Sequence, residues 1–182
     1  MAYEAGVLTV SDLGSRGERQ DTAGPAVAAL LEGAGFAVTR TRIVPDDQVE
    51  IVGALQDWCE EGVAVVVTTG GTGLAPRDRT PEATALVVEY QVPGIPQAMR
   101  AAFTDRIPEA MLSRGIAGVR GRTLILNLPG SEKAARENLE LALPVLVHAC
   151  DLLHEDAPDV AETHRQVQGQ IQGEHGPADP KA

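Results

Sequence analysis

Apolar segments alternate along the first half of the chain with segments whose apolar positions recur at helical spacing. Residues 5–10 form a short apolar run, residues 36–44 have the pattern of a second strand, and residues 63–67 are the most apolar stretch, β-branched nearly throughout. These three segments predict strands, the last of them central and parallel. Residues 21–34 and 47–58 carry apolar side chains three and four positions apart, which predicts two amphipathic helices.

Capping residues mark where these two helices begin. Asp21 is placed to cap the first helix, and Asp47 with Glu50 three positions later forms a capping-box-like start for the second. The order strand, helix, strand, helix, strand predicts right-handed crossovers and an α/β fold with helices on both faces of a sheet. Ligands in such folds bind at the carboxyl ends of the strands.

The second half of the chain continues with shorter elements. Thr80 is the expected N-cap of a helix that has Pro81 at its first position. Another helix is expected after the proline-glycine break at residues 93–94, and residues 115–120 and 123–127 predict either a hairpin or two adjacent strands.

A last helix is expected near the end of the folded part. Ser131 is the expected cap of this helix, and Leu139, Leu143 and Leu146 recur along it. Pro144 lies inside the pattern and should kink or divide the helix, because proline removes a backbone donor and clashes with the preceding turn.

The 182-residue chain has the composition of a soluble globular protein, with 43% hydrophobic residues. Its formal net charge of −11 argues against non-specific binding to nucleic acid or to an anionic membrane, since both require a positive surface. We find neither a membrane-spanning run nor a signal peptide, and therefore expect a cytoplasmic protein. Cys59 and Cys150 lack a C-x-x-C partner and are expected to be buried thiols, not disulfide or zinc ligands.

Residues 155–182 differ in composition from the rest of the chain, with no aromatic residue and glutamine at every second position from 166 to 172. Such a segment cannot bury enough apolar surface to offset its ordering entropy. We therefore expect one folded domain over residues 1–154 and a disordered acidic tail. Deleting residues 155–182 should leave the melting temperature nearly unchanged in a thermal scan, and a large fall would show that the tail packs on the domain.

A glycine-rich segment, T-G-G-T-G at residues 69–73, directly follows the central strand. Without side chains at Gly70, Gly71 and Gly73, backbone N–H groups and the Thr72 hydroxyl can approach an oxyanion such as phosphate. The segment is neither a Walker A loop nor a dinucleotide-binding fingerprint. Tight turns also use glycine for backbone reasons alone, so spacing by itself leaves both interpretations open.

Acidic residues at the predicted strand ends favour a metal-phosphate site. Asp78 lies five residues beyond the last glycine of the loop, between two arginines, and Asp46 and Asp12 follow the second and first strands. Magnesium is typically held by one or two carboxylates together with substrate phosphates. Asp47 is better explained as a helix cap, and Asp12 equally well by an Asx turn, whereas Asp46 has no predicted structural role.

A third cluster lies between residues 112 and 131. Asn127 ends an apolar strand before the Pro129–Gly130 turn, where it can hydrogen-bond a heterocycle, although an ordinary turn followed by a helix cap explains the segment as well. The four histidines have no metal-ligand spacing, and no nucleophilic triad is indicated. A site that binds phosphate and a metal ion therefore remains the candidate chemistry.

These segments occur in an order typical of a known family. They are residues 11–12, 44–47, 69–73, 77–82, 93–95, 111–114 and 127–130. Together they resemble the MogA/MoaB-type proteins of molybdenum cofactor biosynthesis, the molybdopterin adenylyltransferase family, over roughly residues 5–154. Arg79, where the family often has valine, and Glu132, where it often has proline, depart from the pattern.

The resemblance implies a three-layer α/β/α fold with a mostly parallel sheet, usually trimeric, that transfers AMP from ATP to the terminal phosphate of molybdopterin and releases pyrophosphate. It implies that Asp46 and Asp78 are the catalytic acids that hold Mg²⁺, and that Arg77 and Arg114 hold phosphates. The implied substrate-binding residues are Ser11, Asp12, Gly70, Gly71, Thr72, Gly73, Ser113, Arg114, Asn127 and Pro129.

Two other functions stay open from the sequence. The family includes members that keep the pterin pocket without transferring AMP, so the chain could be a molybdopterin carrier or a non-catalytic paralogue; retention of both aspartates favours the enzyme. A general nucleotide-binding module would bind nucleotide without the pterin. The same domain type also occurs in the molybdenum-insertion step, but there as one part of a much longer multidomain chain, and we expect 182 residues to lack room for the other domains. The molybdenum-insertion protein is a candidate protein partner.

Overall fold

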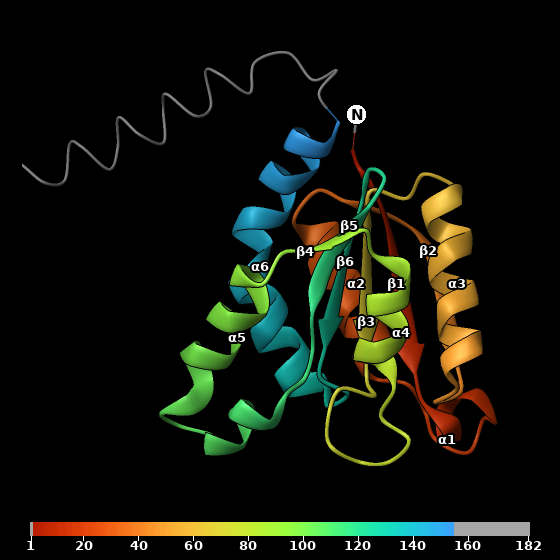
Figure 1. Ribbon diagram of the computed structural model, residues 1–182, viewed down its shortest axis with the longest axis vertical. Coiled ribbons are helices and arrows are strands. Elements are labelled where there is room, and N and C mark those ends of the chain that lie inside the picture. The colour runs from red at the N-terminus through yellow and green to blue at the C-terminus, as the bar shows by residue number, and fades with distance from the viewer. Residues whose placement is uncertain (1, 155–182) are drawn as a thin grey trace, which may run out of the picture.

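Strands and helices alternate in the computed structural model, which describes residues 2–154 (Figure 1). The strands are β1 (Glu4–Val10), β2 (Ala37–Val44), β3 (Val65–Thr69), β4 (Tyr90–Gln91), β5 (Ala117–Arg120) and β6 (Thr123–Leu128). The helices are α1 (Asp12–Ser15), α2 (Ala23–Gly33), α3 (Gln48–Glu60), α4 (Thr80–Val87), α5 (Gly94–Thr104), the 3-10 helix η1 (Pro108–Leu112) and α6 (Glu132–Leu153).

The strands form one sheet in the order β2-β1-β3-β6-β5-β4. The first four are parallel, with Val67 paired to Val7 of β1 and to Leu126 of β6. Strands β5 and β6 are antiparallel and are joined through Gly121, whose φ is +55°, so the hairpin is the correct alternative. Because the four parallel strands share a direction, their carboxyl ends meet at the lower edge of the sheet in Figure 1.

Helices cover both faces of the sheet, which confirms the α/β prediction. Val65 and Val67 of β3 pack into a core cluster with α2, α5 and α6, whereas Val66 packs on the opposite face with α3 and α4. Every residue of β3 and β6 is buried, as expected for central strands with both faces covered. The lone tryptophan, Trp58, packs with Ile51 and the rest of the second cluster.

Helix caps follow the predictions at two positions. The Asp47 carboxylate accepts hydrogen bonds from the backbone of Val49 and Glu50, and the Ser131 hydroxyl accepts one from Ala134. Asp21 likewise accepts from Gly24 N at 2.9 Å, although the N-cap position of α2 is occupied by Thr22.

The prediction for the start of α4 is wrong, and of the two alternatives for Pro144, a kink or a division of the helix, the structure excludes the division. Helix α4 starts at Thr80 and its N-cap is Arg79, because the Thr80 hydroxyl donates to Gly70 O at 2.9 Å instead of capping the helix. Helix α6 runs through Pro144 without being divided. Pro144 and Glu140, one turn earlier, are both exposed, so the carbonyl that loses its donor lies on the side open to water.

The cysteines match their prediction in part, and no membrane span is found. Cys150 is buried, Cys59 is only partly buried, and both thiols are free. Between residues 2 and 154, no helix is both long and apolar enough to cross a bilayer. The expectations about the tail, residues 155–182, fall outside the described residues.

Candidate functional site

The glycine-rich loop is built so that side chains would not fit at its start. Gly70 has a φ of +97°, and a Cβ there would lie 2.3 Å from Val10 O. Gly71 has a φ of +63°, and its Cβ would lie 2.3 Å from the Thr80 hydroxyl and 3.3 Å from Asp46 Oδ1. Gly70 N also donates to Leu128 O, so backbone packing accounts for part of the glycine spacing.

Asp12 and Asp46 tie the loops after β1 and β2 together. Asp12 N donates to Asp46 Oδ2 at 2.8 Å, and Asp46 N donates to Asp12 Oδ1 at 3.0 Å. Asp46 therefore has a structural role that the sequence did not predict. Asp12 forms no Asx turn, because its carboxylate binds the Asp46 backbone and takes both Nε and Nη2 of Arg77, each at 2.7 Å.

The charges around Asp46 favour a bound cation. Burial raises the pKa of Asp46, and the neighbouring carboxylates of Asp12 and Asp78 raise it further. The hydrogen bond from Arg77 lowers the pKa of Asp12, which therefore stays ionised. A divalent cation beside Asp46 would relieve this repulsion and favour its charged form.

Asp46 and Asp78 flank the glycine-rich loop. Asp46 Oδ1 lies next to Gly71, and Asp78 Oδ2 lies 2.8 Å from the position of a Cβ on Gly73 while accepting from Ala75 N at 3.0 Å. Within the described residues, no three acids, histidines or cysteines converge into a full ligand set. The carboxylates of Asp46 and Asp78 beside this loop nevertheless fit Mg²⁺, which takes its other oxygen ligands from phosphates and water.

A cavity of about 420 Å³ opens beside this loop, between α5, η1 and the start of α6. Four of the predicted site residues line it: Thr72, Gly73, Ser113 and Pro129. Most of the lining is apolar, with Arg100 and Asn138 among its few polar groups. An apolar cavity with a few polar groups suits a planar heterocycle. The lining residues absent from the predicted motifs include Leu74, Met99, Phe103, Ile107, Glu109 and Glu137.

A smaller, polar hollow of about 180 Å³ lies on the β1 side of the loop. Ser11 lines it together with Arg19, whose Nη2 donates to the Ser11 hydroxyl at 3.1 Å. Ser11 also accepts from Gly14 N as the cap of α1. Arg19 was missed because no motif marks it. It reaches the site only through the fold of the segment between α1 and α2.

Asn127 does not line the cavity, contrary to the expectation that it binds substrate. It is 1% exposed, its Nδ2 donates to the hydroxyls of Thr68 and Thr84, and its Oδ1 accepts from Ile116 N. These bonds occupy both ends of the amide and join β6 to β3, α4 and the segment before β5. The side chain therefore has no group left for a heterocycle in this conformation.

Truncating Asn127 should consequently act on stability. Asn127→Ala leaves the Ile116 N–H without its acceptor and is expected to lower the free energy of unfolding by about 1–3 kcal/mol. Urea unfolding of the variant measures this loss. An unchanged unfolding midpoint with weakened substrate binding would instead return Asn127 to the role of a ligand-binding residue.

Arg77 and Arg114 both form ion pairs within the chain. Arg77 is paired with Asp12, and Arg114 donates to Gly73 O and Asp78 O and forms an ion pair with Glu82. The expectation that these arginines hold phosphates is not met in this conformation. Of the two, Arg77 is the more exposed, with 62% of its side chain accessible, so it can exchange Asp12 for another anion at little cost.

Comparisons with known proteins identify the family of the chain. A family model described as "Probable molybdopterin binding domain" matches residues 6–148. The chain is 39% identical to the molybdopterin adenylyltransferase of Helicobacter pylori strain J99 over 167 residues, which cover 89% of this chain and 94% of that protein. The structure of the molybdopterin biosynthesis enzyme MoaB from Thermus thermophilus has 54% identity and a TM-score of 0.79, covering 83% of this chain and 96% of that one.

Other relatives are much longer than this chain. The molybdenum cofactor synthesis protein cinnamon of Drosophila melanogaster is 43% identical over 173 residues, which cover 93% of this chain but 29% of that protein. Across three such longer relatives, the chain spans 24–48% of their length.

Proposed function

The chain belongs to the family of probable molybdopterin binding domains, and we propose that it transfers AMP from ATP to the terminal phosphate of molybdopterin, releasing pyrophosphate. The observation that carries the proposal is the placement of Asp46 and Asp78 on either side of a glycine-rich loop that borders an apolar cavity. Identity near 40% to several molybdopterin adenylyltransferases supports the enzyme over a binding protein.

The proposed reaction requires no general base from the protein. A phosphate monoester has a second pKa near ~6 and is largely a dianion at neutral pH, so its oxygen can attack the α-phosphate of ATP directly. This agrees with the site, because the cavity lining and the carboxylate pair include no histidine. The protein instead positions the two phosphates and neutralises their charge.

Asp46 and Asp78 would hold a magnesium ion, which supplies positive charge to the ATP phosphates. In this proposal, backbone N–H groups of the glycine-rich loop donate to the phosphate oxygens. Arg77 would exchange its ion pair with Asp12 for one with the developing pyrophosphate, which carries more negative charge than a carboxylate. The apolar cavity would hold a planar ring system of the substrates next to Thr72 and Gly73.

Separate binding measurements distinguish this proposal from its alternatives. We expect calorimetry to show that molybdopterin alone and Mg-ATP alone each bind, and that Asp78→Asn weakens the binding of Mg-ATP only. Tight pterin binding with no ATP binding would indicate a carrier. ATP binding without any pterin binding would indicate a general nucleotide-binding module.

We further propose a cytoplasmic homotrimer that passes its product to the molybdenum-insertion protein. Exposed apolar side chains on α6, including Leu141 and Val145 at 42% and 48% exposure, support an interface. Relatives in which the matching segment is part of a longer chain support a partner that acts on the same pathway. Light scattering should give three times the 19.1 kDa mass of one chain, and a monomer mass would overturn the trimer.

A further inference from the structure

Arg114 donates hydrogen bonds to the glycine-rich loop and to the segment that follows it. Its backbone N–H donates to Thr72 O at 2.9 Å, its Nε to Gly73 O at 2.7 Å and its Nη2 to Asp78 O at 2.7 Å. Its Nη1 pairs with the carboxylate of Glu82 in the first turn of α4. One residue thus fixes the end of the glycine-rich loop, the backbone of Asp78 and the first turn of α4.

The neighbours of Arg114 face the cavity. Ser113 and Gly115 both line it, and Arg100 of α5 donates from Nη1 to the carbonyl oxygens of these two residues at 3.3 and 3.2 Å. The segment 113–115 thus accepts hydrogen bonds from α5 and donates hydrogen bonds to the loop that carries Asp78. The segment therefore connects the wall of the cavity, through hydrogen bonds of Arg114, to the loop that carries Asp78.

The Arg114–Glu82 pair is better enclosed than the other ion pairs of the described residues. The two side chains are 33% and 36% exposed, and Glu82 Oε2 is buried with no hydrogen-bond partner. All three guanidinium nitrogens of Arg114 donate hydrogen bonds. Two of the acceptors are the backbone carbonyls of Gly73 and Asp78, and the third is the Glu82 carboxylate, whose charge holds the guanidinium in this orientation. A lysine offers one compact ammonium group and cannot reach these three separate acceptors in the same planar arrangement.

We infer that Arg114, held in place by Glu82, is a positioning residue that fixes Asp78 and the glycine-rich loop relative to a molecule bound in the cavity. The inference rests on the proposed function, since it concerns how the pterin end and the phosphate end of the reaction are aligned. It assigns Arg114 no contact with substrate, and it assigns Glu82 a role in the reaction.

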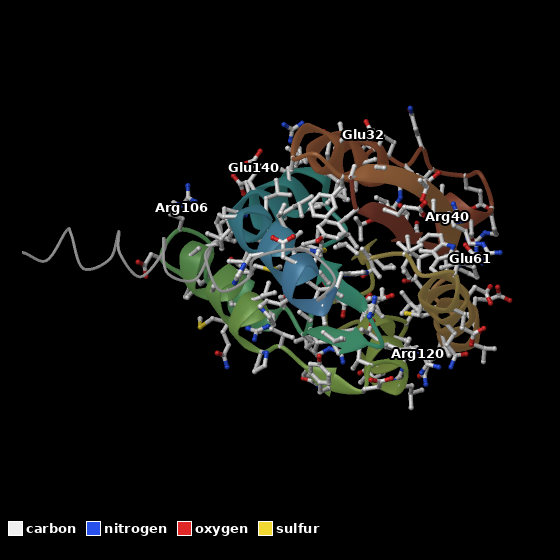
Figure 2. The ribbon with its side chains drawn as sticks, turned by 90° about the horizontal axis from the view of Figure 1, so that it is seen from above. Glu32, Arg40, Glu61, Arg106, Arg120 and Glu140 are labelled. Carbon is white, nitrogen blue, oxygen red and sulfur yellow. The ribbon has the colours of Figure 1, made fainter. Side chains whose placement is uncertain are left out.

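Two conservative variants of the full chain test this role. Arg114→Lys and Glu82→Gln should each lower kcat for AMP transfer by about 10- to 100-fold and raise the Mg²⁺ concentration needed for half-maximal rate, with little change in KM for molybdopterin. The matched control is Glu61→Gln. This variant removes the charge of Glu61 from its ion pair with Arg40, in which Nε and Oε2 are 2.7 Å apart and the side chains are 39% and 47% exposed. Figure 2, seen from the edge of the sheet opposite the site, labels both residues.

The outcomes separate positioning from the alternatives. A raised KM for molybdopterin with unchanged kcat and Mg²⁺ dependence would make Arg114 a direct ligand and overturn the inference. Kinetics equal to those of Glu61→Gln would also overturn it. If the wild-type chain transfers no AMP, the proposed function fails. The positioning role of Arg114 is then tested by the binding of Mn²⁺-ATP, followed by electron paramagnetic resonance. Weaker binding in Arg114→Lys and Glu82→Gln than in Glu61→Gln supports positioning, and equal binding contradicts it.

Discussion

We expect Asp78→Asn to lower the rate of AMP transfer by about 100- to 1,000-fold while the fold is retained. Asparagine has the same shape as aspartate and keeps an oxygen that can accept from Ala75 N, so the loop is preserved. What is lost is the negative charge beside Gly73, which together with Asp46 would hold Mg²⁺. The effect should therefore appear in turnover and not in the unfolding midpoint.

Asp57→Asn is the matched control for this variant. Asp57 is an exposed acid of α3 that lies 3.9 Å from Arg42, away from the loop that carries Asp78. Steady-state turnover and circular dichroism on both variants separate chemistry from folding. Wild-type turnover by Asp78→Asn would remove Asp78 from the proposed metal site.

Gly70→Ala should have the largest effect on stability. Its φ of +97° disfavours any residue with a Cβ, and that Cβ would lie 2.3 Å from Val10 O, a backbone atom of the neighbouring strand that cannot turn away. We expect a loss of at least about 3 kcal/mol, which lowers the melting temperature by about 6–12 °C. Because the same displacement moves Gly71 away from Asp46, activity should fall with it.

Gly53→Ala provides the comparison within the same chain. Gly53 lies inside α3, and a Cβ there meets no atom within 4 Å. Alanine should raise stability by about 0.5–1 kcal/mol, because it lowers the entropy cost of forming the helix. A melting temperature for Gly70→Ala as high as that of Gly53→Ala would show that the loop can relax around a side chain.

The elements that carry the site could be predicted from local patterns. The β-branched run at residues 63–67 and the cap at Asp47 depend on near neighbours in the sequence. Asp47 caps α3 as predicted, and the strand is present but runs over Val65–Thr69, two residues later than predicted. The carboxyl-edge location of the loops then follows from parallel strand order. Asp46 and the glycines were found because they closely follow predicted strands, and Asp78 because it lies five residues beyond the last glycine, between two arginines.

The hydrogen-bond partners of the site residues could not be predicted in the same way. Asn127 lies at the end of an apolar strand, as a ligand-binding residue would, yet its amide donates to Thr68 and Thr84, 59 and 43 residues away in the sequence. Arg114 looks like a phosphate ligand until Glu82, 32 residues away, is placed beside it. The cavity was predicted in part: Thr72, Gly73, Ser113 and Pro129 line it as expected, whereas Met99 and Phe103 appear in the sequence only as residues of a helix.

The measurement that tests the account most directly is pyrophosphate release from Mg-ATP by the purified chain, with and without molybdopterin, with mass spectrometry of the pterin product. We expect release that depends on the pterin, together with an adduct heavier by one AMP group. A folded protein that binds molybdopterin tightly and releases no pyrophosphate would contradict the account. It would also leave Asp46 and Asp78 without the chemistry assigned to them.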